Sequence, residues 1–453
     1  MTILKKAAIG SILLTLAVSS NVTASHAQSL DLKTIQAEVE SVTDVPNPVL
    51  TSEEILRIAD MHINGYLKDD WQTKGLNLKP SPNQIPLYDL ESNVIAYMIP
   101  LLSGDQEIGY ISIGALRDSY DAYDIFIDDQ VVQSIRDRLS PLSIASLDDP
   151  SSSKLVFVPP MTYMIQTNQG QEEQYLQLED DFESVEDVTQ AVTEQKDQLQ
   201  QQYRELKTPK NEQRMQRVLE EGSNANSFMA AAAVTKEDYA LTVEASQQRF
   251  VPVNVGSGTY SYGGDQGWWG DIAPKSPTKE TRGCAPVAAA NLTTYLAKIT
   301  NPSVYRNLYS GVATSQNDFL AHMNVMYNYI NPGLLGETSV YHFIDSVEKY
   351  AKDKNVNLKA VYDSTPFTLD NTANYAKAGL RINSPVATLN LSKFTDYEYE
   401  WHWMTITKYY RDVNDNRWIA VSTWGKRRSI NYRTHFEAMT RFKSLGGGLV
   451  YFK

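Results

Sequence analysis

Residues 281–286, TRGCAP, lead directly into the segment VAAANLTTYLAKI at 287–299. The alanines favour a helix, and Pro286 stands where a first helical turn tolerates proline. The segment therefore predicts a helix that begins at Cys284, the single cysteine of the 453 residues. Gly283 would let the backbone turn sharply before it. The N–H groups of a first helical turn lower a thiol pKa and can hold an oxyanion, so we expect a reactive thiol; the alternative is a small buried apolar side chain.

A general base for this thiol is expected in residues 400–412, EWHWMTITKYYRD. Apolar residues and threonines alternate after His402, which predicts a strand, and DVNDN at 412–416 predicts a turn before the returning strand RWIAVSTW at 417–424. This hairpin would bring His402 opposite the end of the second strand, where a residue that orients the imidazole belongs. His342 and His435 remain alternative bases, and His402 could instead be a structural histidine in an aromatic cluster.

These features resemble the papain-like cysteine peptidase superfamily, and most closely its bacterial branch of bacteriocin-leader-processing peptidases. The resemblance rests on Gly-Cys-Ala-Pro at 283–286, on His402 at a strand start and on Trp-Gly at 424–425, and it covers residues 259–453. It implies an α+β domain in which a helix carrying Cys284 packs on an antiparallel sheet carrying His402. It further implies that Cys284 is the nucleophile, that His402 is the base and that position 422 orients the imidazole.

Two positions depart from the pattern of the superfamily. Position 422 is Ser422, where the superfamily has Asn or Asp, so the orienting group would be an uncharged hydroxyl. The superfamily also places a glutamine before the cysteine to complete the oxyanion hole. The close-spaced slot holds Thr278, whereas Gln266 lies further upstream, and we assign the oxyanion role to Gln266; its alternative is a turn residue beside two tryptophans.

The chain before residue 259 divides into four predicted parts. A charged start, an apolar run and Ser-His-Ala predict a secretory signal peptide over 1–27. A small α/β-mixed domain follows over 28–178, with a helix at 51–68 whose N-cap would be Ser52 and with β-rich runs at 94–99 and 108–113; it resembles streptopain-type propeptides. The charged stretch 179–222 predicts helix, and 223–258 predicts a linker with a processing site.

Composition and motifs indicate which classes of ligand and partner this chain is not expected to bind. A net charge of −13 offers no basic surplus for nucleic acid. The histidines are scattered and no HExxH or CxxC pair occurs, so we expect neither a metal site nor an organic cofactor. After Val18 no run is as long and apolar as the signal segment, so no membrane anchor is expected once that segment is removed.

The sequence thus predicts a secreted or wall-associated bacterial cysteine peptidase that acts on peptide or protein substrates. It would be made as a latent precursor inhibited by its own N-terminal region. Three alternatives stay open: a cell-wall amidase or peptidoglycan peptidase with the same dyad, a weakened papain-fold binding module, and an inhibitor or chaperone role for the N-terminal half. Five tryptophans (Trp268, Trp269, Trp401, Trp403 and Trp424) would line a substrate cleft or belong to the core.

Overall fold

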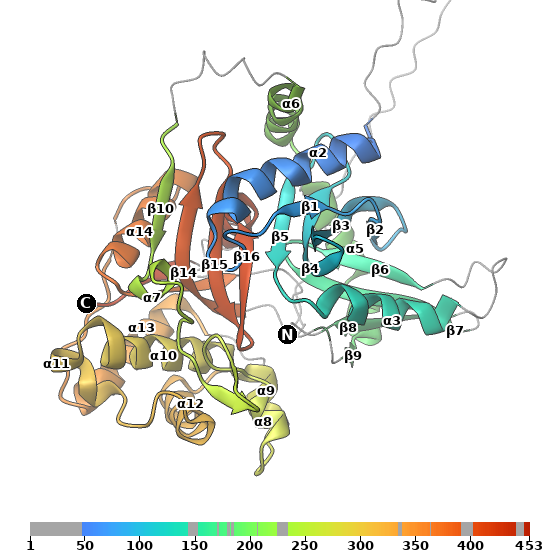
Figure 1. Cartoon of the computed structure of the whole chain (residues 1–453). Coiled ribbons are helices and arrows are strands. Elements are labelled where there is room, and N and C mark those ends of the chain that lie inside the picture. The colour runs from blue at the N-terminus through green and yellow to red at the C-terminus, as the bar shows by residue number, and fades with distance from the viewer. Residues whose placement is uncertain are drawn as a thin grey trace, which may run out of the picture. The chain divides into compact units, whose positions relative to one another are not determined.

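A computed structural model describes most of the chain after Asn47 (Figure 1). The described residues are 48–143, 153–169, 172–178, 182, 185–205, 207–223, 234–333, 338–362, 364–390, 402–440 and 448–453. They belong to one unit that extends from Pro48 to Lys453. The predicted signal peptide, 1–27, lies outside the described residues.

The N-terminal part begins with a helix and continues as a sheet. Its elements are α2 (Ser52–His62), η1 (Ile63–Leu67), β1 (Leu78–Pro80), β2 (Ile85–Tyr88), β3 (Val94–Ser103), β4 (Gln106–Gly114), β5 (Ala122–Phe126), α3 (Val131–Ser143), β6 (Lys154–Val158), β7 (Thr162–Gln169), β8 (Glu172–Leu178) and β9 (Val185–Asp187). The predicted helix and the two predicted β-rich runs are confirmed. The N-cap is Thr51 rather than Ser52, because the Thr51 hydroxyl accepts the Glu54 N–H at 3.2 Å while the Glu54 carboxylate accepts the Thr51 N–H at 2.8 Å.

The charged stretch forms helices, as its composition indicates. They are α4 (Thr189–Glu194), α5 (Lys196–Glu205) and α6 (Pro209–Ser223). Each contributes an apolar side chain to the interior, such as Val192, Leu199 and Met215. The stretch is therefore packed on the rest of the chain, α4 against β8 and α6 against α2, rather than solvated on all sides.

The predicted linker is folded in its described portion. Glu237–Ala240 forms β10, which pairs antiparallel with β14, and Thr242–Ala245 forms the short helix α7. Leu241 and Phe250 are fully buried, so the apolar residues of this low-charge stretch serve the core. Residues 234–258 therefore differ from an open connection, while 224–233 lie outside the described residues.

The C-terminal part alternates helices with an antiparallel set of strands. Its elements are β11 (Asn254–Gly256), β12 (Thr259–Tyr260), α8 (Trp268–Asp271), α9 (Pro277–Arg282), α10 (Cys284–Tyr295), η2 (Leu296–Thr300), α11 (Pro302–Tyr305), η3 (Arg306–Leu308), α12 (Gln316–Ile330), α13 (Val340–Asp353), α14 (Leu369–Arg381), β13 (Val386–Asn390), β14 (His402–Arg411), β15 (Arg417–Thr423), β16 (Lys426–Asn431), α15 (Tyr432–Thr440) and β17 (Leu449–Val450). The α10 helix packs against β14 and α12, which confirms a mixed α+β class with helices beside a largely antiparallel sheet (Figure 1).

A single sheet joins the two parts of the chain. Its order is β17-β13-β14-β15-β16-β5-β4-β3-β2-β6-β7-β8-β9, and the junction is the antiparallel pairing of β16 with β5, in which Ser429 lies opposite Ile125. The predicted regions 28–178 and 259–453 therefore share backbone hydrogen bonds.

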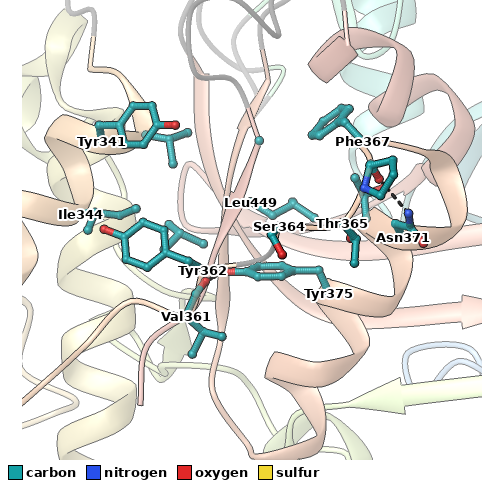
Figure 2. Close-up of a pocket in the computed structure, with 15 residues that line it drawn as sticks. Tyr341, Ile344, Val361, Tyr362, Ser364, Thr365, Phe367, Asn371, Tyr375 and Leu449 are labelled. Carbon is teal, nitrogen blue, oxygen red and sulfur yellow. Dashed lines mark hydrogen bonds between the residues drawn. The ribbon is translucent and has the colours of Figure 1, made fainter.

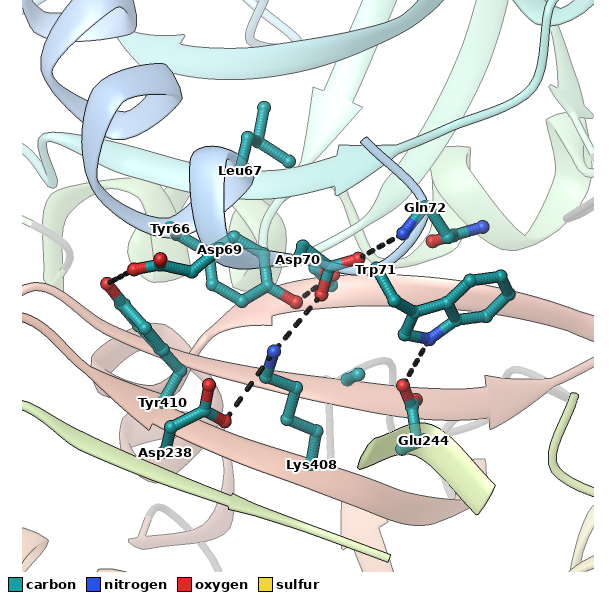
Figure 3. A network of polar contacts seen from close by, with 12 residues as sticks. Tyr66, Leu67, Asp69, Asp70, Trp71, Gln72, Asp238, Glu244, Lys408 and Tyr410 are labelled. Carbon is teal, nitrogen blue, oxygen red and sulfur yellow. Dashed lines mark hydrogen bonds and ion pairs between the residues drawn. The ribbon is translucent and has the colours of Figure 1, made fainter. Parts of the chain in front are cut away.

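A network of buried charges reinforces this junction, and Figure 3 shows part of it. Asp70 lies just after η1, 3.5 Å from the Lys408 ammonium on β14 and 2.8 Å from the Arg427 guanidinium on β16. Glu244 of α7 accepts from Arg427 at 2.8 Å and also from the Trp71 indole. The segment after η1 is thus held to the strands that carry the predicted site.

Candidate active site

The helix that carries Cys284 begins where the sequence predicts. Cys284 is the first residue of α10, and every residue of α10 is buried, in keeping with its small side chains. Gly283 has an ordinary helical φ of −90°, so the sharp turn expected of it is not found. Its role is steric, since a Cβ there would clash with the Trp269 indole and the Lys279 carbonyl oxygen.

The pKa of the Cys284 thiol is raised, whereas its position at a helix start predicted a lowered pKa. Cys284 is 9% exposed, and burial raises the pKa of its thiol to about 11 although hydrogen bonding from the backbone of Trp403, Ala285 and Cys284 itself lowers it. The N-terminal turn of α10 therefore does not leave a thiolate at neutral pH in this arrangement, because desolvation outweighs it. The backbone hydrogen bond with Trp403 brings the sulfur to the start of β14, one residue after His402 in the chain.

His402 is the first residue of β14, and the predicted hairpin is present. The strands β14 and β15 pair antiparallel, with Thr405 opposite Ser422. The Nε2 atom of His402 lies 2.7 Å from the Thr423 hydroxyl, and this contact holds the orientation of the ring.

Thr423, rather than Ser422, is the hydroxyl that contacts the imidazole. Ser422 Oγ donates to the Tyr262 carbonyl at 2.6 Å and accepts from the Asn291 amide at 3.4 Å, so it ties β15 to α10. Neighbouring residues of a strand point to opposite faces, which separates the two hydroxyls. The family pattern led to position 422; alternation places Ser422 and Thr423 on opposite faces, and only the register of the hairpin decides which of them meets His402.

Gln266 is buried, 4% exposed, just before α8. Its side-chain N–H donates to the Glu280 carbonyl on α9, the short helix that leads into Gly283 and Cys284. The Gln266 amide thus holds α9, the segment that precedes α10. Its role as an oxyanion donor stays a prediction. The alternative slot, Thr278, lies on α9 itself.

The rival histidines have structural partners. His435 is fully buried on α15, its Nε2 atom lies 2.7 Å from the Thr388 hydroxyl, and burial lowers its pKa to about 3. His342 on α13 lies with Nε2 2.5 Å from the Ile330 carbonyl oxygen. Neither has the strand-start position beside Cys284 that His402 has.

Comparison with protein-family profiles, curated proteins and solved structures finds no match. The assignment of the site therefore rests on the geometry given above. In the part of the chain that the structure describes, no group of three or more metal-ligating side chains comes together. Among the same residues, no helix combines the length and apolar character needed to cross a bilayer.

The tryptophans divide between core and cavity. The Trp403 ring is buried, stacks on Phe343 at 4.2 Å between centroids and donates to the Thr338 carbonyl at 2.9 Å. Trp269 is also buried. Trp268 and Trp424 line a cavity of about 490 Å³ together with residues of both parts of the chain, while Trp401 lies outside the described residues.

One apolar residue of the N-terminal part joins the core of the C-terminal part. Met161, in the turn between β6 and β7, is buried in the same apolar cluster as Cys284. Burial raises the pKa of Glu280 on α9, and the charges of Asp271 and of Glu186 on β9 add to that rise. The turn after β6 therefore contributes to the core that also contains Cys284, and Glu186 on β9 is near enough to Glu280 to raise its pKa.

Proposed function

We propose that this chain is a cysteine peptidase in which Cys284 is the nucleophile and His402 is the general base. One observation carries the proposal: the Trp403 backbone reaches the Cys284 sulfur, next to a histidine whose Nε2 is held by Thr423. Nucleophile, base and orienting group then occur in the order that acyl transfer requires.

The reaction follows from these positions. His402 Nδ1 takes the thiol proton, and the Cys284 sulfur bonds to the carbonyl carbon of a peptide while the carbonyl oxygen becomes an oxyanion. The N–H groups at the start of α10 stabilise that oxyanion. The imidazolium then gives its proton to the leaving amine as the C–N bond breaks, and water, deprotonated by His402, releases the acyl group from sulfur.

Thr423 sets the strength of the base. In the proposed enzyme the Thr423 hydroxyl accepts a hydrogen bond from the Nε2–H of His402, which selects the tautomer in which Nδ1 acts as the base. It has no charge with which to stabilise imidazolium, in contrast to a carboxylate. We therefore expect a slower enzyme than one with a charged third residue.

The precursor would be latent because its thiol is buried and protonated. Met161 extends the same apolar core from the N-terminal part, and burial of the sulfur keeps the pKa of the thiol near 11. Displacing this turn would hydrate the sulfur, lower its pKa and admit a substrate. Such latency suits a secreted peptidase that must not act before export.

The test compares the wild-type chain with variants at Met161. It measures alkylation of Cys284 by iodoacetamide and turnover of a casein-derived peptide. Met161→Asp should speed labelling at least tenfold and switch on turnover, because a buried carboxylate drives the turn away from the apolar cluster. Met161→Leu, which keeps an apolar side chain of similar volume, should behave as the wild type.

The catalytic residues are tested in the Met161→Asp background. Cys284→Ala should abolish turnover, and His402→Ala should slow alkylation at neutral pH, whereas His342→Ala is the matched control and should do neither. Turnover that survives Cys284→Ala would exclude a cysteine peptidase.

A non-catalytic binding module is the second candidate, favoured by the high pKa of the thiol and the uncharged partner of His402. It predicts that Cys284 stays unreactive in the Met161→Asp chain. A cell-wall amidase would share the chemistry and would differ only in cleaving peptidoglycan fragments in preference to peptides.

A further inference from the structure

A pocket of about 520 Å³ opens beside β17, and Figure 2 shows its walls. Tyr341 and Ile344 of α13 form one side, and Tyr362 and Phe367 form parts of the others, with Leu449 between them. None of the described residues that line it carries a charge. A charged side chain buried there would have no partner, so the lining favours an uncharged apolar group.

The backbone at the edge of the pocket is open to pairing. The Leu389 N–H donates to the Gly448 carbonyl at 3.0 Å, which makes these two residues a hydrogen-bonded antiparallel pair. The next pair, Leu449 with Thr388, is then the non-bonded one. The N–H and C=O of Leu449 therefore point away from β13, and among the described residues neither has a hydrogen-bond partner.

A segment of the same chain already pairs with part of the outer edge of the strand at 449–452. Val361 donates its N–H to the Tyr451 carbonyl at 3.0 Å, and Ala360 forms an antiparallel bridge with Phe452. Residues 359–361 thus continue the sheet along the C-terminal end of this edge. Leu449, two residues before Tyr451, is the next outward-facing position and is only partly buried.

The edge is also close to the candidate catalytic residues. Leu449 lies opposite Thr388 on β13, and Thr388 lies opposite Met404 on β14, two residues after His402. A segment paired with the outer edge of β17 would lie three strand spacings from β14, roughly 14 Å. An extended chain advances about 3.3 Å per residue, so about four or five residues would connect the pocket to the reacting bond.

We propose that this pocket binds an extended segment of the substrate polypeptide. The segment pairs through its backbone with Leu449 and places a large uncharged side chain between Tyr341 and Tyr362. The identity of the occupant as substrate rests on the peptidase proposal, whereas the binding itself does not. Main-chain pairing provides affinity, and the apolar pocket selects the side chain.

The experiment measures binding in the full chain carrying Cys284→Ala, so that hydrolysis does not interfere. The probes are blocked pentapeptides, acetyl-TTXTT-amide, in which X is Phe, Leu, Glu or Lys, and binding is followed by thermophoresis. Peptides with Phe or Leu should bind at least tenfold more tightly than those with Glu or Lys. Methylation of the backbone nitrogen of X should cost at least tenfold, and binding should protect the Leu449 amide from hydrogen exchange.

A pair of variants locates the site. Tyr341 and Tyr362 are 66% and 69% exposed, so Tyr341→Glu with Tyr362→Glu should leave folding intact while it weakens binding of the Phe peptide at least tenfold. The matched control is Val304→Glu with Val312→Glu, which adds the same charge at two other exposed apolar positions, 52% and 60% exposed, and should leave binding unchanged.

Equal affinity for the Phe and Glu peptides, an equal loss in the control pair, or no binding at millimolar peptide would overturn the inference. The two proposals fail separately. A chain that hydrolyses peptides but binds none at Leu449 contradicts this inference alone. Binding at Leu449 without any hydrolysis in the Met161→Asp chain contradicts the peptidase proposal alone.

Discussion

Arg428 Nη2 lies 2.7 Å from Asp124 Oδ2, and the two side chains are 1% and 0% exposed. This ion pair links β16 with β5 of the N-terminal part. The strand β16 pairs directly with β15 of the hairpin that carries His402. Tyr110 and Tyr163 also donate to Asp124, at 2.9 and 2.6 Å. The carboxylate is therefore fully bonded only when both parts of the chain are present.

Removing the charge of Asp124 should be strongly destabilising. Asp124→Asn leaves the Arg428 guanidinium buried without its counter-charge, so the free energy of unfolding should fall by about 3–5 kcal/mol. Urea denaturation monitored by tryptophan fluorescence provides the measurement. Asp128→Asn is the control, because its ion pair with Lys426 is half-exposed at 3.4 Å and should contribute less than about 1 kcal/mol.

A single cut between residues 223 and 234 should not release the C-terminal part. The two fragments would still share the β16–β5 pairing and the buried pairs Arg428–Asp124 and Arg427–Asp70. A protease site placed in this segment, followed by size-exclusion chromatography and mass analysis, should give two fragments that elute together. Separate elution in native buffer would show that the N-terminal part is a dissociable propeptide.

The two fragments of the cut chain should remain associated in mild acid. Burial raises the pKa of Asp70, but the Arg427 and Lys408 charges outweigh it and hold that pKa below 3.8. A carboxylate with a depressed pKa contributes stability above its unfolded pKa and loses that contribution as pH falls through the folded value. Co-elution of the cut fragments should therefore be the same at pH 5 as at pH 7, and separation at pH 5 would contradict the role of this network.

Thr423 and Ser422 should have different roles. Thr423→Val removes the hydroxyl bonded to His402, and the loss of one such bond, about 1 to 1.5 kcal/mol, should reduce turnover in the Met161→Asp chain roughly five- to tenfold. Ser422→Ala should instead lower the free energy of unfolding by about 1 kcal/mol through its lost bond to Tyr262 and leave turnover nearly unchanged. The reverse result would restore Ser422 as the orienting residue.

The pH dependence of alkylation should report the burial of Cys284. With a thiol pKa of about 11, the thiolate fraction rises tenfold per pH unit, so labelling of the intact chain should still be accelerating at pH 10. In urea-unfolded protein the rate should level off above its ordinary pKa of about 8.5. A plateau near pH 8 in the intact chain would show that the thiol is not buried as described.

The sequence by itself determined the local elements around the site. The alanine-rich run after Cys284 predicted α10, and the alternation after His402 predicted the β14–β15 hairpin, because a helix and a strand each impose a period on the apolar residues of one segment. The helix at α2 was predicted with its N-cap one residue late, since Thr51 and Ser52 can both cap and only the reciprocal bond with Glu54 selects Thr51.

Only the tertiary structure decided how these elements act on one another. The pKa of Cys284 depends on how much protein surrounds its sulfur, and that protein includes the backbone of Trp403 on β14, a distant segment of the chain. The choice of Thr423 over Ser422 depends on which face of β15 meets His402, and the junction of β16 with β5 pairs residues some 300 positions apart. Desolvation and long-range strand pairing arise from neighbours that no local period encodes, and for that physical reason the sequence pattern left them open.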